Sequence, residues 1–401
     1  MSITKLEAQV RYANHYLEVL RGANNMYKKG GADSIDHALS IFDLEISQIK
    51  QGYEYAATNL RRDEAMAQLC IKYPDAGAHL LNIRFHPSER IEWLGIALKV
   101  AEELNHSNSV AVNYANLGIA YTQINKFGDA INAYETAIDF FQRNNNQRAE
   151  AGTQNNLGLA YENLGAPRQA IRCYKKALKV ARGIVDKRSE SAALGNLGNI
   201  FNSFGKFRYA VAYYEKALAI HLETGNQRSE ALTKGNLGLA YVNLGHPKEA
   251  LVFFNEVKSI YERLGYQRGL GIAFTNSGLA YEHLDNDESA LREYERALEI
   301  FRQAGDQRSE GSTMGDLARL YHKHGKSHDA LRILENRYIL AVESSDPRGQ
   351  GSALWNIAVI LSDLGDKPSA IIKGQLALAI MQRLEDHNVS KMRSELSAWQ
   401  K

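Results

Sequence analysis

Two kinds of polar side chain recur at a fixed spacing along this chain and could together hold a polypeptide. Asparagine returns at a constant interval, and arginine stands eight residues before most positions of that series. A carboxamide carries both a donor and an acceptor, so a row of them can pair with the N–H and C=O groups of an extended backbone. A guanidinium adds charge-assisted hydrogen bonds to acidic groups. The candidate binding residues are Asn116, Asn156, Asn196, Asn236, Asn276, Asn356, Arg148, Arg188, Arg228, Arg268, Arg308 and Arg348.

Residue patterns that support catalysis are absent from the sequence. There is no GxxxxGK[ST], no HExxH and no GxSxG. His322, His324 and His328 are close in sequence but straddle Gly325, where a turn between two helices is expected. The two cysteines, Cys70 and Cys173, are isolated and are expected to be buried thiols. We therefore expect no enzymatic activity, no cofactor and no metal site.

The elements that carry the candidate residues follow from an internal repeat with a constant period. Seven copies align without a gap, and each copy places a large residue three positions after a small one, as Tyr161 follows Gly158. Alanine fills another column in every copy: Ala130, Ala170, Ala210, Ala250, Ala290, Ala330 and Ala370.

Each copy has the periodicity of two helices. In one copy the apolar spacing predicts helices over about 148–164 and 167–182. Gly165 is expected to cap the first helix, and Pro167 to begin the second. Glycine at Gly158 and its equivalents, inside the first helix, indicates that the second helix packs too closely to leave room for a side chain. The alanine column would supply the matching small surface. The stop signal at Gly165 recurs at Gly205, Gly245, Gly325 and Gly365.

The pattern Gly158, Tyr161, Ala170, Tyr174 and Ala177 resembles the tetratricopeptide repeat, with a period of about 40 residues instead of about 34. The longer period resembles the repeats of Pins-type spindle-orientation adaptors and kinesin light chains. This resemblance implies an all-α fold, a right-handed superhelix (α-solenoid) with an N-terminal helical segment, and a role in binding other proteins. It also implies that an asparagine ladder at this helix position binds the ligand, as in several tetratricopeptide proteins.

The expected organisation has four parts. Residues 1–65 form an N-terminal helical segment outside the register, split at Lys28-Lys29-Gly30-Gly31, and residues 66–107 form a degenerate repeat. Residues 108–387 form seven repeats, and residues 388–401 a capping helix. The stretches 42–45, 53–56 and 86–94 resemble the segment that leads into the repeats of bacterial STAND-type signalling NTPases. Since the chain has no nucleotide-binding module, that resemblance implies kinship with the sensor half alone.

The candidate residues are expected to form a stripe that points out of the core. At 100° per residue, Arg148, Gly152, Asn156 and Leu159 fall together on the far side of the first helix. Small residues along the stripe would leave it open to a ligand. The asparagines could instead bond the backbone of the neighbouring repeat. The arginines could pair with Glu150, Glu190, Glu230 and Glu310 or with the preceding helix.

One repeat breaks the ladder. Asp316 stands in place of asparagine, with Arg319, His322, Lys323 and His324 nearby. This repeat is either a specificity pocket or a copy that has drifted from the pattern, and drift is the preferred interpretation.

Composition narrows the class of partner. The 401 residues carry a formal net charge of +2 with no long basic run, which argues against nucleic acid. There is no stretch of about 20 apolar residues for a membrane span and no apolar N-terminal segment for secretion. We therefore expect a cytoplasmic protein.

These observations together predict a non-enzymatic scaffold or sensor that holds an extended, acidic protein or peptide segment. The alternative is a peptide-responsive allosteric regulator, or the sensor module of a STAND-type signalling switch that acts on a partner effector. The oligomeric state stays open.

Overall fold

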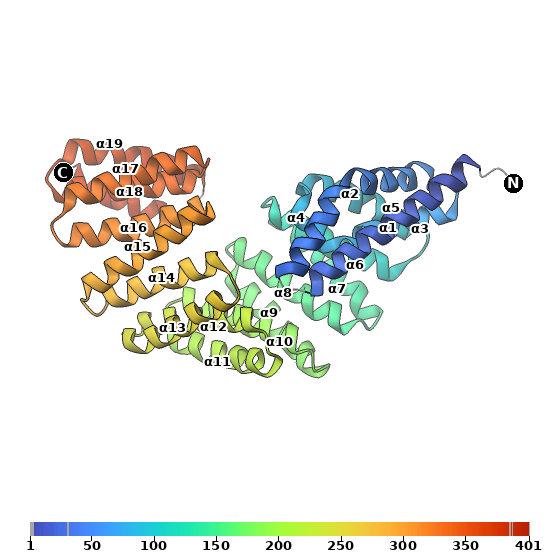
Figure 1. Cartoon of the computed structure of the whole chain (residues 1–401), viewed down its shortest axis with the longest axis horizontal. Coiled ribbons are helices and arrows are strands. Elements are labelled where there is room, and N and C mark those ends of the chain that lie inside the picture. The colour runs from blue at the N-terminus through green and yellow to red at the C-terminus, as the bar shows by residue number, and fades with distance from the viewer. Residues whose placement is uncertain (1–3, 30–31, 385, 387, 401) are drawn as a thin grey trace. The chain divides into compact units, whose positions relative to one another are not determined.

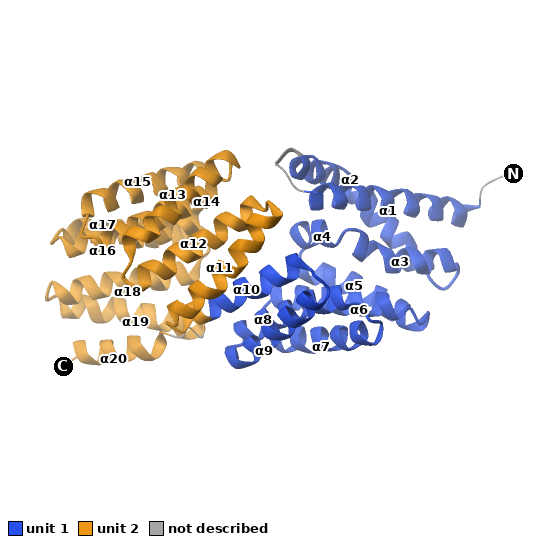
Figure 2. Ribbon diagram, turned by 90° about the horizontal axis from the view of Figure 1, so that it is seen from below, with its two compact units in different colours: residues 1–200 blue, residues 201–401 orange. Residues whose placement is uncertain are grey.

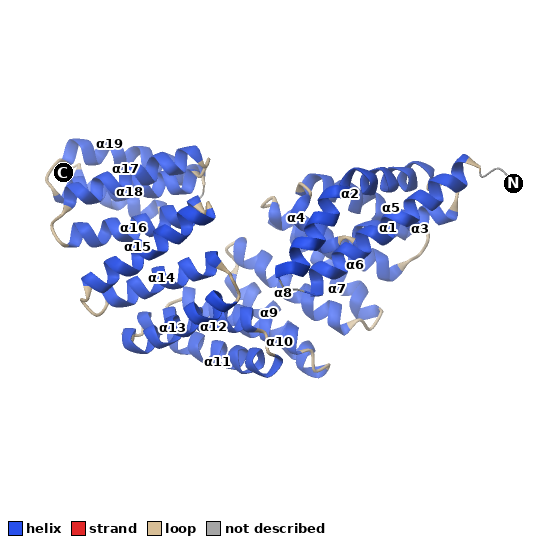
Figure 3. Ribbon diagram, in the orientation of Figure 1, coloured by secondary structure: helices blue, strands red, loops and turns tan. Residues whose placement is uncertain are grey.

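The structure is a computed structural model that describes residues 4–29, 32–384, 386 and 388–400. These residues form twenty α-helices and no strand (Figures 1 and 3). The helices divide into two compact units, residues 1–200 and residues 201–401 (Figure 2). The expected all-α class is confirmed.

The first unit contains ten helices among its described residues, the last of which runs just past the boundary. They are α1 (Lys5–Lys29), α2 (Ala32–Asn59), α3 (Glu64–Ala76), α4 (Ala78–Arg84), α5 (Pro87–Glu103), α6 (Ser107–Gln123), α7 (Phe127–Arg143), α8 (Gln147–Asn163), α9 (Pro167–Gly183) and α10 (Lys187–Ser203).

The second unit continues the same pattern. Its helices are α11 (Phe207–Thr224), α12 (Gln227–Asn243), α13 (Pro247–Arg263), α14 (Gln267–Glu282), α15 (Asp287–Ala304), α16 (Gln307–Lys323), α17 (Ser327–Glu343), α18 (Pro347–Asp363), α19 (Lys367–Arg383) and α20 (Val389–Trp399).

Helices α6 to α19 begin at equal intervals along the sequence, and a left-handed residue separates each from the next. The predicted caps are confirmed, since Gly165, Gly205, Gly245, Gly325 and Gly365 all have positive φ. A hydrogen bond closes each turn, as from the amide N of Ala166 to the carbonyl O of Tyr161 at 2.8 Å. Six further turns lack glycine, which the sequence pattern did not predict: Asn105, Asn125, Asn145, Val185, Asp285 and Ser345.

The glycines inside the first helices lie under aromatic rings. A Cβ on Gly238 would lie 2.7 Å from Cζ of Phe254, whose side chain comes from the second helix of the same repeat. Gly118, Gly158 and Gly278 meet Tyr134, Tyr174 and Tyr294 in the same way. The expected close approach of the second helix is therefore confirmed, and rings from that helix fill the space beside the glycines. The alanines of the column are fully buried, and Ala130 belongs to the same apolar cluster as Tyr134.

Aromatic stacking and buried hydrogen bonds hold the N-terminal helices together. Tyr53 of α2 stacks on Trp93 of α5 with ring centroids 3.8 Å apart. The hydroxyl of Tyr73 donates to the carbonyl O of Ala13 at 2.8 Å. The buried Asn24 of α1 accepts hydrogen bonds from the first amides of α4, which stands between α3 and α5. The predicted split at 28–31 falls between α1 and α2, although Gly30 and Gly31 lie outside the described residues.

At the C-terminal end, α20 covers the last repeat. Its buried Met392 and Leu396 face the repeat, and Trp399 stacks on Trp355 of α18. Residues 385, 387 and 401 of the predicted last repeat and cap lie outside the described residues. The four-part division of the chain stays a prediction.

Candidate functional site

In the second unit the predicted stripe residues line cavities between successive first helices. The cavity between α12 and α14, over α13, has a volume of about 340 Å³. It brings together Arg228, Asn236 and Asn276 of the predicted set. Its wall is otherwise mostly apolar, with Leu232, Leu239, Phe254, Val257, Tyr261, Tyr266 and Ile272. Leu232 and Ile272 are 61% and 43% exposed.

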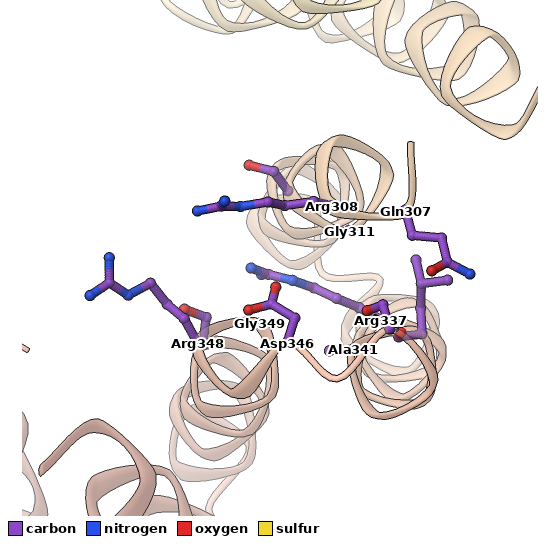
Figure 4. A pocket seen from close by; sticks show the side chains of 12 residues that line it. Gln307, Arg308, Gly311, Arg337, Ala341, Asp346, Arg348 and Gly349 are labelled. Carbon is purple, nitrogen blue, oxygen red and sulfur yellow. Dashed lines mark hydrogen bonds between the residues drawn. The ribbon is translucent and has the colours of Figure 1, made fainter. Parts of the chain in front are cut away.

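Two further cavities lie between α16 and α18, over α17. The first, of about 190 Å³, is lined by Arg308 and Arg348 of the predicted set, together with Arg337 and Asp346 (Figure 4). The second, of about 360 Å³, brings Asn356 together with Asp316, Arg319 and Arg337. Gly311, Ser312, Gly315 and Ser352 contribute little bulk to these walls, as expected for an open stripe.

The stripe asparagines are half-buried, and most have free amide groups. Within the described part of the chain, Asn116, Asn156, Asn196, Asn276 and Asn356 make no side-chain hydrogen bond. The bond to a neighbouring repeat is made one residue away, where Nδ2 of Asn155 donates to the carbonyl O of Ser189 at 3.3 Å. These five amides are thus available to a ligand, and their contact with one stays a prediction.

The stripe arginines are exposed, and their partners differ from the expected glutamates. Three of them pair with an aspartate that precedes a later helix. Arg148 pairs with Asp186 before α10 at 3.9 Å, and Arg268 pairs with Asp306 before α16 at 3.0 Å. At the C-terminal end, Arg348 pairs with Asp386 before α20 at 3.7 Å. Arg228 lies over the ring of Tyr266 at the equivalent position, 4.8 Å from its centroid. The glutamates have other partners, for Arg182 binds Glu190, Arg302 binds Glu310, Lys234 binds Glu230 and Gln142 binds Glu150.

In the first unit the N-terminal helices reach the stripe. Asn116 shares a narrow cavity with Ala78 and Leu81 of α4 and with Trp93 of α5. Further along, Arg188 lies close enough to His79 of α4 to influence its ionisation. The pKa of His79 is lowered first by burial and then by the positive charges of Lys28 and Arg188. One end of the ladder therefore lies beside α4, which the sequence did not predict.

The broken ladder position forms a charge network. Asp316 accepts a hydrogen bond from Nη2 of Arg319 at 3.2 Å. The same guanidinium donates to Glu282, which also accepts the hydroxyl hydrogen of Tyr294. Burial raises the pKa of Asp316, whereas Arg319 opposes that shift. Asp316, which replaces the asparagine of the ladder, therefore belongs to a hydrogen-bonded network that includes side chains of α14 and α15.

The histidines near this repeat have separate partners. His322 contacts Oγ of Ser327 at 2.9 Å and Asp363 at 3.0 Å, whereas Nε2 of His324 lies 2.7 Å from Asp287. Over the described residues, no group of three or more histidine, cysteine or acidic side chains is arranged to hold a metal ion.

Two other structural findings concern the cysteines and the membrane. Cys70 and Cys173 are buried as expected, and burial raises the pKa of each thiol to about 11. No helix in the described ranges combines the length and apolar character needed to cross a membrane.

Sequence reasoning missed two features of these cavities. Tyr261 and Tyr266 of the apolar wall were not predicted, and neither was Arg337. The signal for Arg337 was present, because it occupies a column that holds a small apolar residue in the other repeats: Ala137, Ala177, Ala217, Val257, Ala297 and Ala377.

Comparison with solved structures shows the same fold in several proteins. The apo form of the quorum sensor NprR from B. thuringiensis is 16% identical with a TM-score of 0.61, covering 87% of this chain and 97% of that one. A Rap protein complexed with Competence and Sporulation Factor is 13% identical with a TM-score of 0.54, covering 98% and 99%. A STAND protein with a tetratricopeptide repeat sensor from Pyrococcus horikoshii is 15% identical with a TM-score of 0.56, covering 95% of this chain and 65% of that one.

Comparison at the level of sequence identifies the family. No curated protein matches the chain. Family models described as tetratricopeptide repeat match residues 111–143, 149–223, 231–264 and 269–337, more than half of the chain. Together with the paired helices and the glycine–ring contacts, these matches show that the chain belongs to the tetratricopeptide-repeat family.

Proposed function

We propose that this protein is a non-enzymatic scaffold or sensor that binds an extended polypeptide segment along the stripe of its first helices. The observation that carries the proposal is the row of half-buried amides of Asn116, Asn156, Asn196, Asn276 and Asn356, which make no side-chain hydrogen bond within the described residues. Asn276 and Asn356 line cavities between successive first helices. Unpaired amides beside a cavity are suited to bind the N–H and C=O groups of an extended backbone.

The nature of the cavities supports a polypeptide over a small molecule. They are hollows of a few hundred Å³ at two places along the second unit, one with a mostly apolar wall between α12 and α14 and two with arginines in the wall between α16 and α18. A small ligand is usually enclosed in one deep pocket, whereas a polypeptide places successive side chains in successive hollows. The exposed stripe arginines favour acidic side chains in the ligand.

The experiment that tests this function is a peptide-array screen with two matched double variants. The first carries Asn276→Ala and Asn356→Ala on the stripe. The control carries Asn255→Ala and Asn336→Ala, which are exposed on the second helices α13 and α17. We expect the wild type and the control to capture the same peptides, and the stripe variant to bind them at least about tenfold more weakly.

Two results would argue against the proposal. A wild-type protein that captures no peptide has no such binding function, and a stripe variant that binds as tightly as the control places the ligand elsewhere. Circular dichroism of all three proteins separates loss of binding from loss of the fold.

A second candidate function is that of a regulator whose N-terminal helices respond to the bound segment. The observation in its favour is that α4 lies beside the ladder at Asn116 and that Arg188 of the stripe influences His79 of α4. Among proteins of this fold are a quorum sensor, a Rap protein complexed with Competence and Sporulation Factor and a STAND protein. Hydrogen exchange of α1 and α4, with and without a captured peptide, tests this candidate. Exchange that does not change favours the simple scaffold.

A further inference from the structure

Arg337 is a cation at a position that the other repeats fill with a small apolar residue. Five of the equivalent residues are alanines with no exposed surface, and the sixth is the buried Val257. A guanidinium at a core position is costly unless it has hydrogen-bond partners. Nevertheless, within the described ranges Arg337 has no side-chain hydrogen bond and no ion pair.

The neighbouring helix makes room for this arginine. A Cβ on Gly315 would overlap Nη1 of Arg337, and a Cβ on Gly311 would lie 3.8 Å from Cγ of Arg337. The two glycines of α16 therefore allow the side chain to run from α17 toward the cavity. Figure 4 shows Arg337 extending toward the space between Arg308 and Arg348, beside Asp346.

The charges around this cavity favour an anion. Three guanidinium groups line it against one carboxylate, that of Asp346. Arg348 is engaged with Asp386 at 3.7 Å, whereas Arg308 and Arg337 have no acidic group within ion-pair distance among the described residues. Burial lowers the pKa of Arg337, and the carboxylates of Asp316 and Asp346 oppose that shift without forming an ion pair with it among the described residues. A planar guanidinium with free N–H groups is suited to bind a carboxylate in bidentate fashion.

The distance between this site and the apolar cavity of the same unit fixes the spacing of two ligand residues. It lies between α12 and α14, and the Arg337 cavity lies between α16 and α18. Successive first helices contact one another along this series, and packed helices are about 10 Å apart. The two cavities are therefore about 20 Å apart, which an extended chain spans in about six residues.

We infer that the cavity around Arg337 binds the carboxylate of an acidic side chain, and that an apolar side chain about six residues away in the same segment fills the cavity between α12 and α14. This inference rests on the proposed function and adds to it the chemistry and spacing of two ligand residues. The order of the two residues in the peptide sets the direction in which the ligand runs.

The test uses pairs of synthetic peptide libraries of about ten residues with blocked termini, so that no terminal carboxylate competes. One library of each pair has a leucine and a glutamate six positions apart, and the other has glutamine in place of the glutamate. Both orders of the two fixed residues are made, as well as a pair with a spacing of three. Retention on the immobilised full-length protein is measured for the wild type and two variants.

The variants are matched in residue type and helix. Arg337→Ala restores the residue of the other repeats, so we expect it to fold at least as well as the wild type. Arg332→Ala is the control, because Arg332 is on the same helix with its side chain 76% exposed and lines neither cavity. We expect the wild type and Arg332→Ala to prefer glutamate over glutamine by about tenfold or more at the six-residue spacing in one order. Arg337→Ala should retain the peptides without this preference.

The outcomes separate the inference from the proposed function. Peptides retained equally with glutamate and glutamine, or a preference that survives Arg337→Ala, would overturn the carboxylate site while the peptide-binding function stands. A glutamate preference that does not depend on spacing would overturn the two-residue register. If the wild type retains no peptide in any library or on the array, the function fails and the inference fails with it.

Discussion

Two glycines three residues apart on α12 should respond to alanine in opposite directions. Gly238 lies under the fully buried ring of Phe254, and a Cβ there would be 2.7 Å from Cζ and 2.9 Å from Cδ1. Gly235 has nothing within 4 Å of its Cβ position and lines the apolar cavity. Both sit inside a helix, so helix propensity alone favours alanine at either position by about 1 kcal/mol.

Packing decides the sign at Gly238. Forcing a methyl group into a filled site costs about 1–3 kcal/mol, and contacts this short lie in the upper part of that range. After the gain in helix propensity, we expect Gly238→Ala to lower the free energy of unfolding by about 1–2 kcal/mol. Gly235→Ala should raise it by up to about 1 kcal/mol, while its methyl group narrows the cavity and weakens peptide binding.

The measurement is urea unfolding followed by far-UV circular dichroism on each variant and the wild type. Because repeat proteins need not unfold in one step, the comparison uses midpoints from identical conditions. Another repeat of this chain already combines the two compensating changes, because Ala318 replaces the glycine and Leu334 replaces the ring there. We therefore expect Gly238→Ala combined with Phe254→Leu to be more stable than the sum of the two single changes predicts. Equal midpoints for Gly238→Ala and Gly235→Ala would refute the reasoning.

Three further changes test other parts of the structure. Val185 is 73% exposed with φ at 57°, so Val185→Gly should raise the free energy of unfolding by about 1 kcal/mol. Asn145→Gly should change the free energy of unfolding by only a few tenths of a kcal/mol, because asparagine tolerates the left-handed conformation. Equal urea midpoints for the two variants would contradict this. Glu282→Ala should lower the free energy of unfolding by about 1–3 kcal/mol, because Arg319 and the buried hydroxyl of Tyr294 lose their acceptor. An unchanged thermal midpoint would show that the network adds no stability. The pKa of Asp316 is raised in the folded protein, so its ionisation favours unfolding as pH rises. Asp316→Asn should therefore gain stability relative to the wild type as the pH rises above about 4, and a stability difference that does not change with pH would contradict the shift.

Much of the fold could be predicted because the repeat is reinforced at several levels. The apolar spacing, the glycine stops and Pro167 all mark the same helices, and the predicted helices over 148–164 and 167–182 are found at Gln147–Asn163 and Pro167–Gly183. Turns without glycine were harder to predict, because Val185 has no local preference for the left-handed conformation, which is fixed there by the helices on either side.

The candidate site could be predicted only in part, because side chains on one helix face can have different partners. Periodicity placed the arginines on the stripe but could not choose between the glutamates of their own helices and an aspartate of the next repeat. Arg337 is visible in the sequence as a departure from its column. A departure alone does not distinguish a drifted core residue from a cation held against a cavity, and the distinction depends on the room left by Gly311 and Gly315.

Two adjacent asparagines on α8 bear on what the ladder is for. Asn155 is 6% exposed and donates a hydrogen bond to the backbone of the first helix of the next repeat, which is the structural role that the ladder asparagines would have if they did not bind a ligand. Its equivalents in the other repeats are alanine, glycine, threonine or tryptophan, so this bond is not a general requirement of stacking. Asn156 belongs to a recurring series and makes no side-chain hydrogen bond among the described residues, whereas Asn155 makes such a bond but does not recur. This contrast argues that Asn156 and the four other stripe asparagines without a bond face a ligand and not the neighbouring repeat.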